Sequence, residues 1–443
     1  MTTILSFENS PRLSVPLPFH LTAAAFGVAA GVWLATSPQA WDGNRWSPSI
    51  LSLTHLVTLG VLGHGMVGSL LQLLPVIAGA TVAGGRTTAW ATLAGMSTGT
   101  VLLVAGLARG TAALLVAGGA VLIVALLAIA SLTAAAAWRG TEADATRRAL
   151  RLAPLSLGAV ALLGTLLVAI MGLGAPLPLL NVLHLHVAWG AVGWVCMLII
   201  GVGFTVVPMF QVTPPYPEQV ARSWAPVIAA TLVALAAALA FSSAWAAWLD
   251  AVLALIVLGG AGSTLFVQHK SRRPHDVTRR FWQGSMMSWT LAAALWLARP
   301  WLPESVEPWT HWWLGVLALV GGGVGALDGM LFKIVPFLCW LHLKGRLPRR
   351  SYVPTMQEFI PEKWQRAHWL AFELSLVGLL AMPVVPAIGP HAGAVFAAQQ
   401  AALLVLLVNA LRVYARALAE GKAEAAAARA LDAAPPSRSR STT

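Results

Sequence analysis

Histidines stand near the start of three long apolar stretches, where a polar side chain is unexpected. They are His55 in the stretch 49–79, His184 and His186 in the stretch 180–211, and His311 in the stretch 309–343. A histidine in an apolar segment is costly, so it normally faces the protein interior and hydrogen-bonds or binds a ligand. A neutral imidazole is also a common axial ligand of haem iron. The four side chains are therefore candidate haem or metal ligands; the alternative is that each is an ordinary hydrogen-bonded histidine.

The three stretches share one order of residues. Each begins with histidine, continues with several glycines and reaches a proline 20 to 25 residues after the histidine, in the phrases LLPVI, VVPMF and IVPFL. These prolines, Pro75, Pro208 and Pro336, are 133 and 128 residues apart, a period far longer than that of solenoid repeats. The pattern predicts a threefold internal repeat.

The composition indicates a membrane protein. The 443-residue chain is 58% hydrophobic and only 10% charged, with a mean hydropathy of +0.76, so a soluble fold could not bury its apolar surface. The apolar runs are unbroken, without the alternation of a β-barrel, and each is about as long as the roughly 20 residues that a helical span needs. We therefore predict an all-α polytopic membrane protein, with the lipid bilayer as its first partner.

Twelve transmembrane helices are expected. They cover residues 17–38, 48–80, 86–107, 110–137, 152–173, 180–211, 224–246, 248–267, 282–302, 309–343, 367–387 and 392–415. With the N-terminus inside, 24 of the 28 lysines and arginines fall on the inner side, and only Arg45, Arg109 and Arg299 fall outside. This distribution follows the positive-inside rule and predicts that both termini are cytoplasmic. It also accounts for the net charge of +12 without a nucleic-acid partner.

Twelve spans and three repeats give three pseudo-repeats of four helices, in which the second helix of each repeat carries the histidines. We expect a membrane domain over 1–415, a cytoplasmic alanine-rich helix over 416–434 and a disordered tail over 435–443. The first span shows no compact signal-peptide pattern and is expected to be retained. Cys196 and Cys339 lie inside apolar spans, so no disulfide is expected.

Helical geometry narrows the set of ligands. His55 and His64 are nine residues apart, on opposite helix faces, and His184 and His186 diverge by about 200°, so one member of each pair faces a given centre. The glycines that follow allow either a flat macrocycle or a neighbouring helix to approach the backbone. His64, Asp328 and Lys333 are candidates for a polar path; the alternative for Lys333 is that it snorkels to the cytoplasmic interface.

The predicted topology is similar to a known family. Twelve spans in three groups of four, with histidines on the second, sixth and tenth, resemble subunit I of the haem-copper oxidases and nitric oxide reductases. The phrases HLVTLGVLGHGMVG and HLHVAWGAVGWVCMLIIGVGFTVVPMF also resemble the NnrS-like branch of haem-copper membrane proteins, which is associated with nitric oxide metabolism. The resemblance covers almost the whole chain before Ala415.

The resemblance implies a site and a function. In that family, span-two and span-ten histidines bind a low-spin haem b, which corresponds to His55 and His311, and a span-six histidine binds copper, which corresponds to His184 or His186. The second span-ten histidine and the span-seven histidines have no counterpart here, so the copper site is expected to be incomplete.

The resemblance further implies a bacterial inner-membrane protein that handles nitric oxide or oxygen, or transfers electrons received from quinol; an enzymatic activity would be that of a haem-dependent oxidoreductase. The competing interpretation is a twelve-span transporter without haem, although transporters are commonly built from two halves.

Overall fold

The structure is a bundle of long helices. The computed structural model describes residues 9–41, 44–139, 144–242, 244–348 and 351–433, and every regular element within these ranges is a helix. Ten of the described helices are long and apolar enough to cross a membrane. The prediction of an all-helical, polytopic membrane protein is therefore confirmed, while the predicted tail over 435–443 lies outside the described residues.

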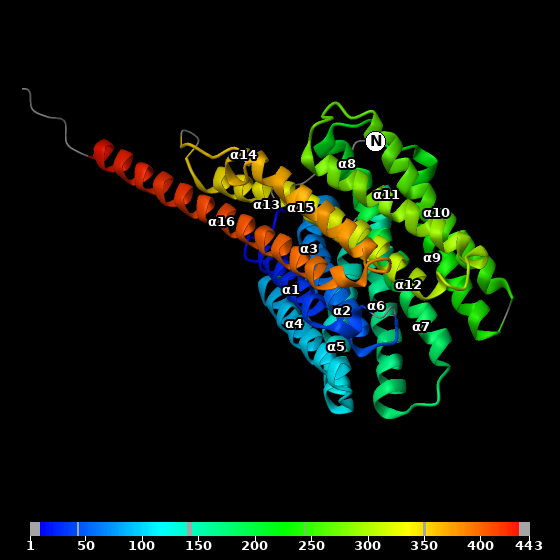
Figure 1. Cartoon of the computed structure of the whole chain (residues 1–443). Coiled ribbons are helices and arrows are strands. Elements are labelled where there is room, and N and C mark those ends of the chain that lie inside the picture. Colours follow the sequence, from blue (N-terminus) through cyan, green and yellow to red (C-terminus); the bar gives the residue numbers. More distant parts are fainter. Residues whose placement is uncertain (1–8, 42–43, 140–143, 243, 349–350, 434–443) are drawn as a thin grey trace, which may run out of the picture.

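Most of the bundle consists of straight helices (Figure 1). These are α1 (Leu17–Thr36), α4 (Gly85–Arg109), α5 (Ala112–Trp138), α6 (Ala145–Leu173), α9 (Glu218–Ala240), α10 (Trp245–His269), α11 (Val277–Ala298), α15 (Glu362–Ala381) and α16 (Gly389–Ala433). Short helical turns in the connections are η2 (Pro38–Ala40), η5 (Arg299–Trp301), α14 (Met356–Phe359) and η7 (Pro386–Ile388).

Three further helices are interrupted, and these contain the histidine-bearing stretches. Each runs as an α-helix, a π-helical segment and a second α-helix. They are α2–η3–α3 (Pro48–His55, Leu56–Gly63, His64–Ala78), α7–η4–α8 (Leu179–Ala188, Trp189–Cys196, Met197–Gln211) and α12–η6–α13 (Glu307–Gly315, Val316–Val324, Gly325–Arg346). In all three, the proline is the twelfth residue of the last segment.

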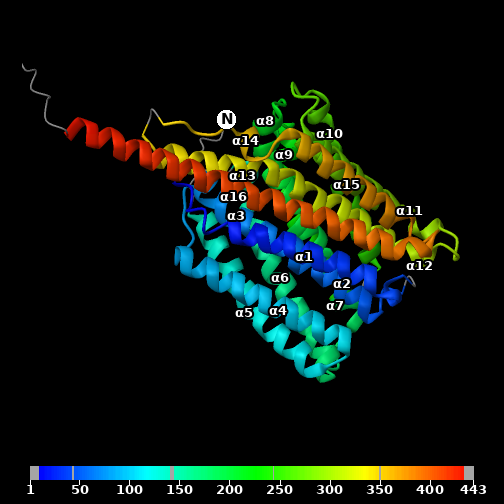
Figure 2. The ribbon, with the colours of Figure 1, turned by 60° about the vertical axis from the view of Figure 1, so that its left-hand side comes forward.

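The helices pack in a pattern that recurs three times. The π-segments η3, η4 and η6 lie against α1, α6 and α11 respectively. The pairs α4 with α5, α9 with α10, and α15 with α16 form extensive contacts, and α5, α10 and α16 continue onto α6, α11 and α1. The last long helix therefore closes the bundle against the first, which Figure 2 shows as α16 lying along α1.

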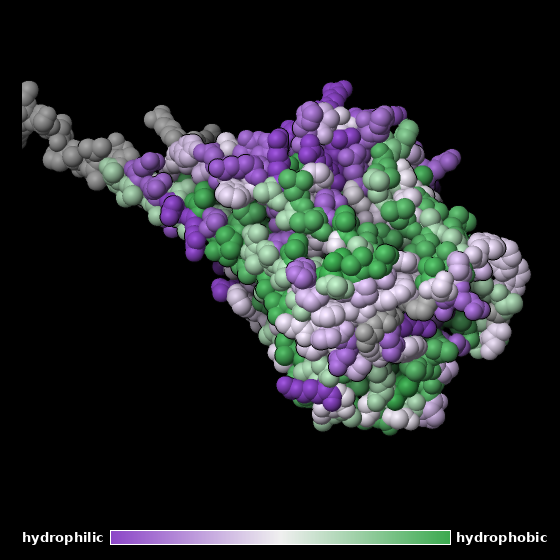
Figure 3. Space-filling model, viewed as in Figure 1, coloured by the Kyte–Doolittle hydropathy of each residue, from purple (hydrophilic) through white to green (hydrophobic). Residues whose placement is uncertain are grey.

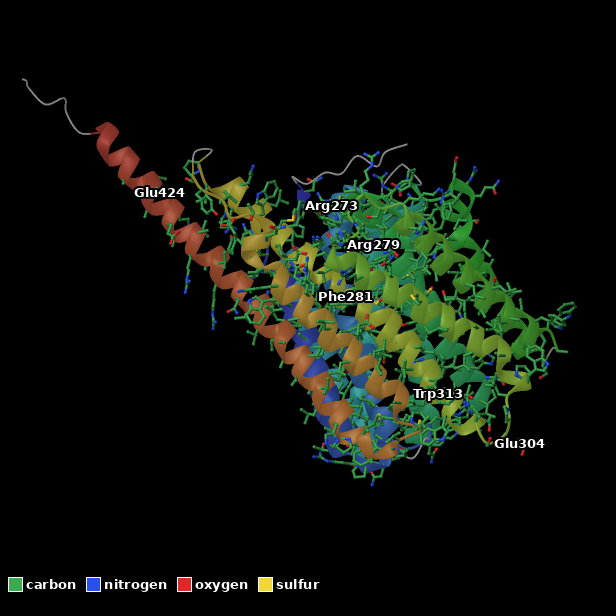
Figure 4. All side chains as sticks on the ribbon, turned by 45° about the horizontal axis from the view of Figure 1, so that its top comes forward. Arg273, Arg279, Phe281, Glu304, Trp313 and Glu424 are labelled. Atoms are coloured by element: carbon green, nitrogen blue, oxygen red, sulfur yellow. The ribbon has the colours of Figure 1, made fainter. Side chains whose placement is uncertain are left out.

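The bundle has two distinct ends. At one end, which we call the basic end, α3, α8 and α13 finish, and Figure 4 shows Arg273 and Arg279 there. At the other, the histidine end, α2, α7 and α12 begin, near Glu304 and Trp313. Hydrophilic residues gather along the basic end in Figure 3, above a body rich in hydrophobic side chains.

The last helix is longer than a membrane is thick. α16 has 45 residues, which corresponds to roughly 68 Å against a hydrocarbon core of about 30 Å. Figure 1 shows its C-terminal part projecting from the bundle. The described part of the helix that we predicted over 416–434 is thus a direct continuation of the last span, because its alanine-rich sequence favours helix despite Gly421.

Close approach of α1 and α16 depends on glycine. A Cβ added at Gly31 would lie 2.4 Å from the backbone nitrogen of Ala397, which cannot move without displacing α16. We predict that Gly31→Ala destabilises the protein by about 1–3 kcal/mol through overpacking. The measurement is thermal unfolding of the purified protein in detergent.

The matched control is Gly262→Ala, because a Cβ at Gly262 in α10 would meet no described atom within 4 Å. It should leave the unfolding temperature unchanged or slightly higher. Equal unfolding temperatures for the two variants would show that the contact between α1 and α16 does not stabilise the bundle.

Candidate cofactor site

The three interrupted helices meet at their π-segments. Both η3 and η4 contact η6 in the interior of the bundle. A π-helical segment inside an α-helix is rare and often marks a functional site. The candidate histidines lie within five residues of the start of these segments, on the histidine end.

His55, the last residue of α2, presents one ring nitrogen to the interior. Its Nδ1 lies 2.8 Å from the carbonyl oxygen of Leu51, one turn earlier. A carbonyl only accepts hydrogen bonds, so Nδ1 carries the hydrogen and Nε2 of the neutral ring keeps its lone pair. This is the tautomer in which Nε2 can bind a metal.

His184 and His186 separate as their helical spacing requires. His184 Nε2 lies 2.9 Å from Oδ1 of Asp250, near the start of α10. His186 points instead toward α6, where a Cβ on Gly164 would lie 3.2 Å from its ring, and it is near enough to His55 to interact with it electrostatically. Its Nδ1 is buried and makes no hydrogen bond of good geometry with the described residues, although the backbone of Val160 in α6 lies close enough to interact with the ring. Of the two, His186 shares a site with His55.

His311 has a different environment. Arg45 Nη1 lies 3.4 Å from its Nδ1, and its electrostatic neighbours are Arg45, Arg299 and Glu307. Because a guanidinium only donates, Nδ1 accepts, and the hydrogen of the neutral ring is on Nε2. In this arrangement, neither nitrogen of His311 offers a free lone pair. The structure therefore brings His55 together with His186, and it places His311 in a charged cluster at the histidine end.

The glycines of these helices fall into two groups: some pack against a neighbouring side chain, and others have no tightly packed neighbour. Gly60, Gly65 and Gly322 are packing glycines, since an added Cβ would collide with Phe26, Leu327 and Trp289 respectively. Two others are open: an added Cβ would meet only Val160, at 3.8 Å, from Gly190, and no described atom within 4 Å from Gly315. Each follows a candidate histidine, His186 or His311, by four residues and so shares its helix face. Neither glycine is therefore closed off by a tightly packed neighbour.

The residues proposed for a polar path lie at separate places. His64 is fully buried between Phe19 and Phe26, and its ring nitrogens bond the carbonyl of Leu59 and the hydroxyl of Ser97. Both nitrogens are occupied, so His64 is a structural histidine that ties α3 to α4.

Lys333 forms an ion pair with Asp276, at 2.6 Å from Nζ to Oδ2. Asp276 is also the N-cap of α11, where its Oδ1 accepts a hydrogen bond from the backbone nitrogen of Thr278. Lys333 therefore fastens α13 to the start of α11 at the basic end. Asp328 lies elsewhere, in a buried cluster with His368, Gln399 and Gln400.

Two polar residues were not singled out from the sequence. Asp250 and His368 lie near the start of predicted apolar spans, and the isolation of Asp250 among apolar residues is the signal that could have identified it. Their partners, His184 and Asp328, come from other helices, and sequence spacing does not reveal such pairs.

Few potential metal ligands lie close together in the described ranges. Within them, no group of three or more His, Cys, Asp or Glu side chains could hold a metal ion. No family model matches the chain, and no curated protein is significantly similar to it. The function must therefore be argued from the geometry.

Replacing Lys333 tests its structural role. Lys333→Met leaves the mostly buried Asp276 carboxylate without its cation, and we predict a loss of about 1–3 kcal/mol of stability, measured by thermal or denaturant unfolding in detergent. The double variant with Asp276→Asn should lose less than the sum of the two single losses, because the two residues stabilise each other. Strictly additive losses would contradict this coupling.

Proposed function

We propose that this chain is a haem-binding membrane protein that holds haem b in the histidine half of the bundle. The observation that carries the proposal is the proximity of His55 and His186, two half-buried imidazoles on different interrupted helices that lie near enough to interact electrostatically, each close to a π-segment. Buried polar atoms are normally paired, and Nδ1 of His186 makes no hydrogen bond of good geometry with the described residues, although the backbone of Val160 lies close enough to interact with the ring. A ligand that coordinates imidazole nitrogen would account for both side chains.

The residues present fit such a group. The tautomer of His55 leaves Nε2 with its lone pair, and no described atom packs tightly against Gly190 or Gly315. His55 and His186 would hold the group, in place of the pair His55 and His311 that the family resemblance implies. Arg45, next to His311, would then pair with an anionic group of the bound cofactor at the membrane surface.

Haem would supply one-electron chemistry and a binding site for nitric oxide or oxygen. This chain's residues would position it and exclude water from it. The proposal contains no copper centre, since His184 and Asp250 contribute only two ligands and already bond each other. Whether turnover follows ligand binding depends on an electron donor.

Quinol is the donor class that fits an apolar membrane protein. A cavity of about 90 Å³ lies between α3, α8 and α13 in the basic half, several times the roughly 10–15 Å³ that one water occupies by the same measure. Its walls are mainly apolar. The side chain of Gln72 lines it, and the amide oxygen of Gln72 is buried without a partner among the described residues. This oxygen is suited to accept a hydrogen bond from a quinol hydroxyl.

We further propose twelve spans in three pseudo-repeats of four. α11 and α15, with 22 and 20 residues, are about 33 and 30 Å long, enough to cross the hydrocarbon core beside the ten more apolar helices. The recurring contact pattern and the closure of α16 on α1 support this arrangement. The basic loops then place both termini in the cytoplasm, and the plasma membrane of a bacterium is the membrane proposed.

The test is the reduced-minus-oxidised visible spectrum of the protein purified from haem-replete cells. We predict a b-type haem signal that is lost in His55→Ala and in His186→Ala. The matched control is His184→Ala, which removes a neighbouring imidazole on the same helix and should retain the signal.

His311→Ala distinguishes the two ligand pairs. Retention of the signal supports His186 as the second ligand, and its loss, together with a normal His186→Ala spectrum, would support the pair implied by the family resemblance. A folded but colourless protein contradicts the haem proposal and favours a transporter.

A further inference from the structure

A second buried polar site lies where α13, α15 and α16 meet. Asp328, His368, Gln399 and Gln400 are each at most 3% exposed, although they lie within helices of an apolar bundle. The rings of Phe281 and Phe332 flank His368, at centroid distances of 5.9 and 5.3 Å. The cluster is thus enclosed by apolar groups, where an unbalanced charge is costly.

The hydrogen bonds of the cluster show which of its atoms donate and which accept. The amide nitrogens of Gln399 and Gln400 each lie 2.8 Å from Oδ2 of Asp328. The Gln399 nitrogen is also 2.8 Å from Nε2 of His368. Amide N–H groups only donate, so Nε2 of His368 accepts and its ring is neutral, while Oδ2 of Asp328 accepts two bonds, as an ionised carboxylate does.

That arrangement carries one uncompensated negative charge. The charged groups on the surrounding elements are engaged or displaced: Lys333 pairs with Asp276, and Arg280 of α11 stacks on Trp369. Glu373 lies five residues beyond His368, about 140° around α15. α16 contributes only the two amide side chains to the cluster. The nearest titratable residue of α1 is His20, which lies two turns before Gly27, the residue that Gln400 contacts.

Several polar atoms of the cluster form no hydrogen bond. Oδ1 of Asp328, Nδ1 of His368 and the amide oxygens of Gln399 and Gln400 are buried without hydrogen-bond partners in the part of the chain that the structure describes. His368 Nε2 already lies 3.4 Å from Oδ2 of Asp328. A hydrogen added to this nitrogen would point at the carboxylate and neutralise the pair.

We propose that Asp328 and His368 form a proton-binding site inside the membrane. The proton adds to the lone pair of Nε2 of His368, forming an N–H bond directed at Asp328, and the Gln399 amide gives up its bond to the ring. Release reverses these steps, and nothing is oxidised or reduced. A metal cation is disfavoured because two amide N–H groups already face Oδ2, and their hydrogens would repel it.

The proposal does not depend on haem and is tested separately. Protein labelled with ¹⁵N-histidine is reconstituted in lipid, and the ring nitrogen signals are recorded by solid-state NMR as the pH is varied. The signal missing from His368→Gln assigns the ring. We expect it to change from neutral imidazole to imidazolium as the pH falls.

Asp328→Asn removes the compensating charge and should lower the proton affinity of His368 by about tenfold or more. Asp250→Asn is the matched control, since it removes the carboxylate that pairs with His184 and should leave the His368 titration unchanged. A His368 ring that keeps one protonation state throughout the pH range of the folded protein overturns the proposal. A titration that responds to Na⁺ but not to K⁺ at equal ionic strength also overturns it.

Discussion

A polar side chain inside the membrane must find a partner, and this constraint organises the interior of the protein. Water is absent there, so each unpaired donor or acceptor costs free energy that the helix alone cannot recover. Pairs between helices meet the requirement in several places: His64 with Ser97, His184 with Asp250, and Lys333 with Asp276. The neighbouring imidazoles of His55 and His186, and the cluster around Asp328, which keeps several unpaired polar atoms, are the two candidate functional centres.

The two centres are linked by the design of the interrupted helices. Each combines a histidine end, a π-segment and a proline at the same position of the last segment. The repeated backbone places three similar segments in contact, while the side chains differ from repeat to repeat. His55 and His186 interact across two of the three helices, whereas the third carries His311 in a charged cluster and Asp328 four residues after η6 ends. The repeated backbone thus positions the three helices, and the side chains that differ between the repeats form the two candidate sites.

Apolar periodicity and charge distribution were sufficient to predict the helical membrane fold, because span length and loop charge are local properties of the chain. The helical angle between His184 and His186 likewise predicted that they diverge. The partner of each histidine was not predictable, since Asp250 and Arg45 come from distant segments. The π-segments also escaped prediction, because the glycine-rich sequence fits an uninterrupted helix equally well. His311 was placed in the site by resemblance, and its guanidinium neighbour is visible only in the structure.

The central claim is that two imidazoles, from α2 and α7, hold one haem. Electron paramagnetic resonance of the oxidised, purified protein tests it most directly, because the low-spin ferric signal depends on both axial ligands. The account predicts a low-spin, bis-imidazole spectrum in the wild type that becomes high-spin or disappears in His186→Ala and is unchanged in His184→Ala. A bis-imidazole signal that survives His186→Ala, or a protein that contains no haem iron, would contradict it.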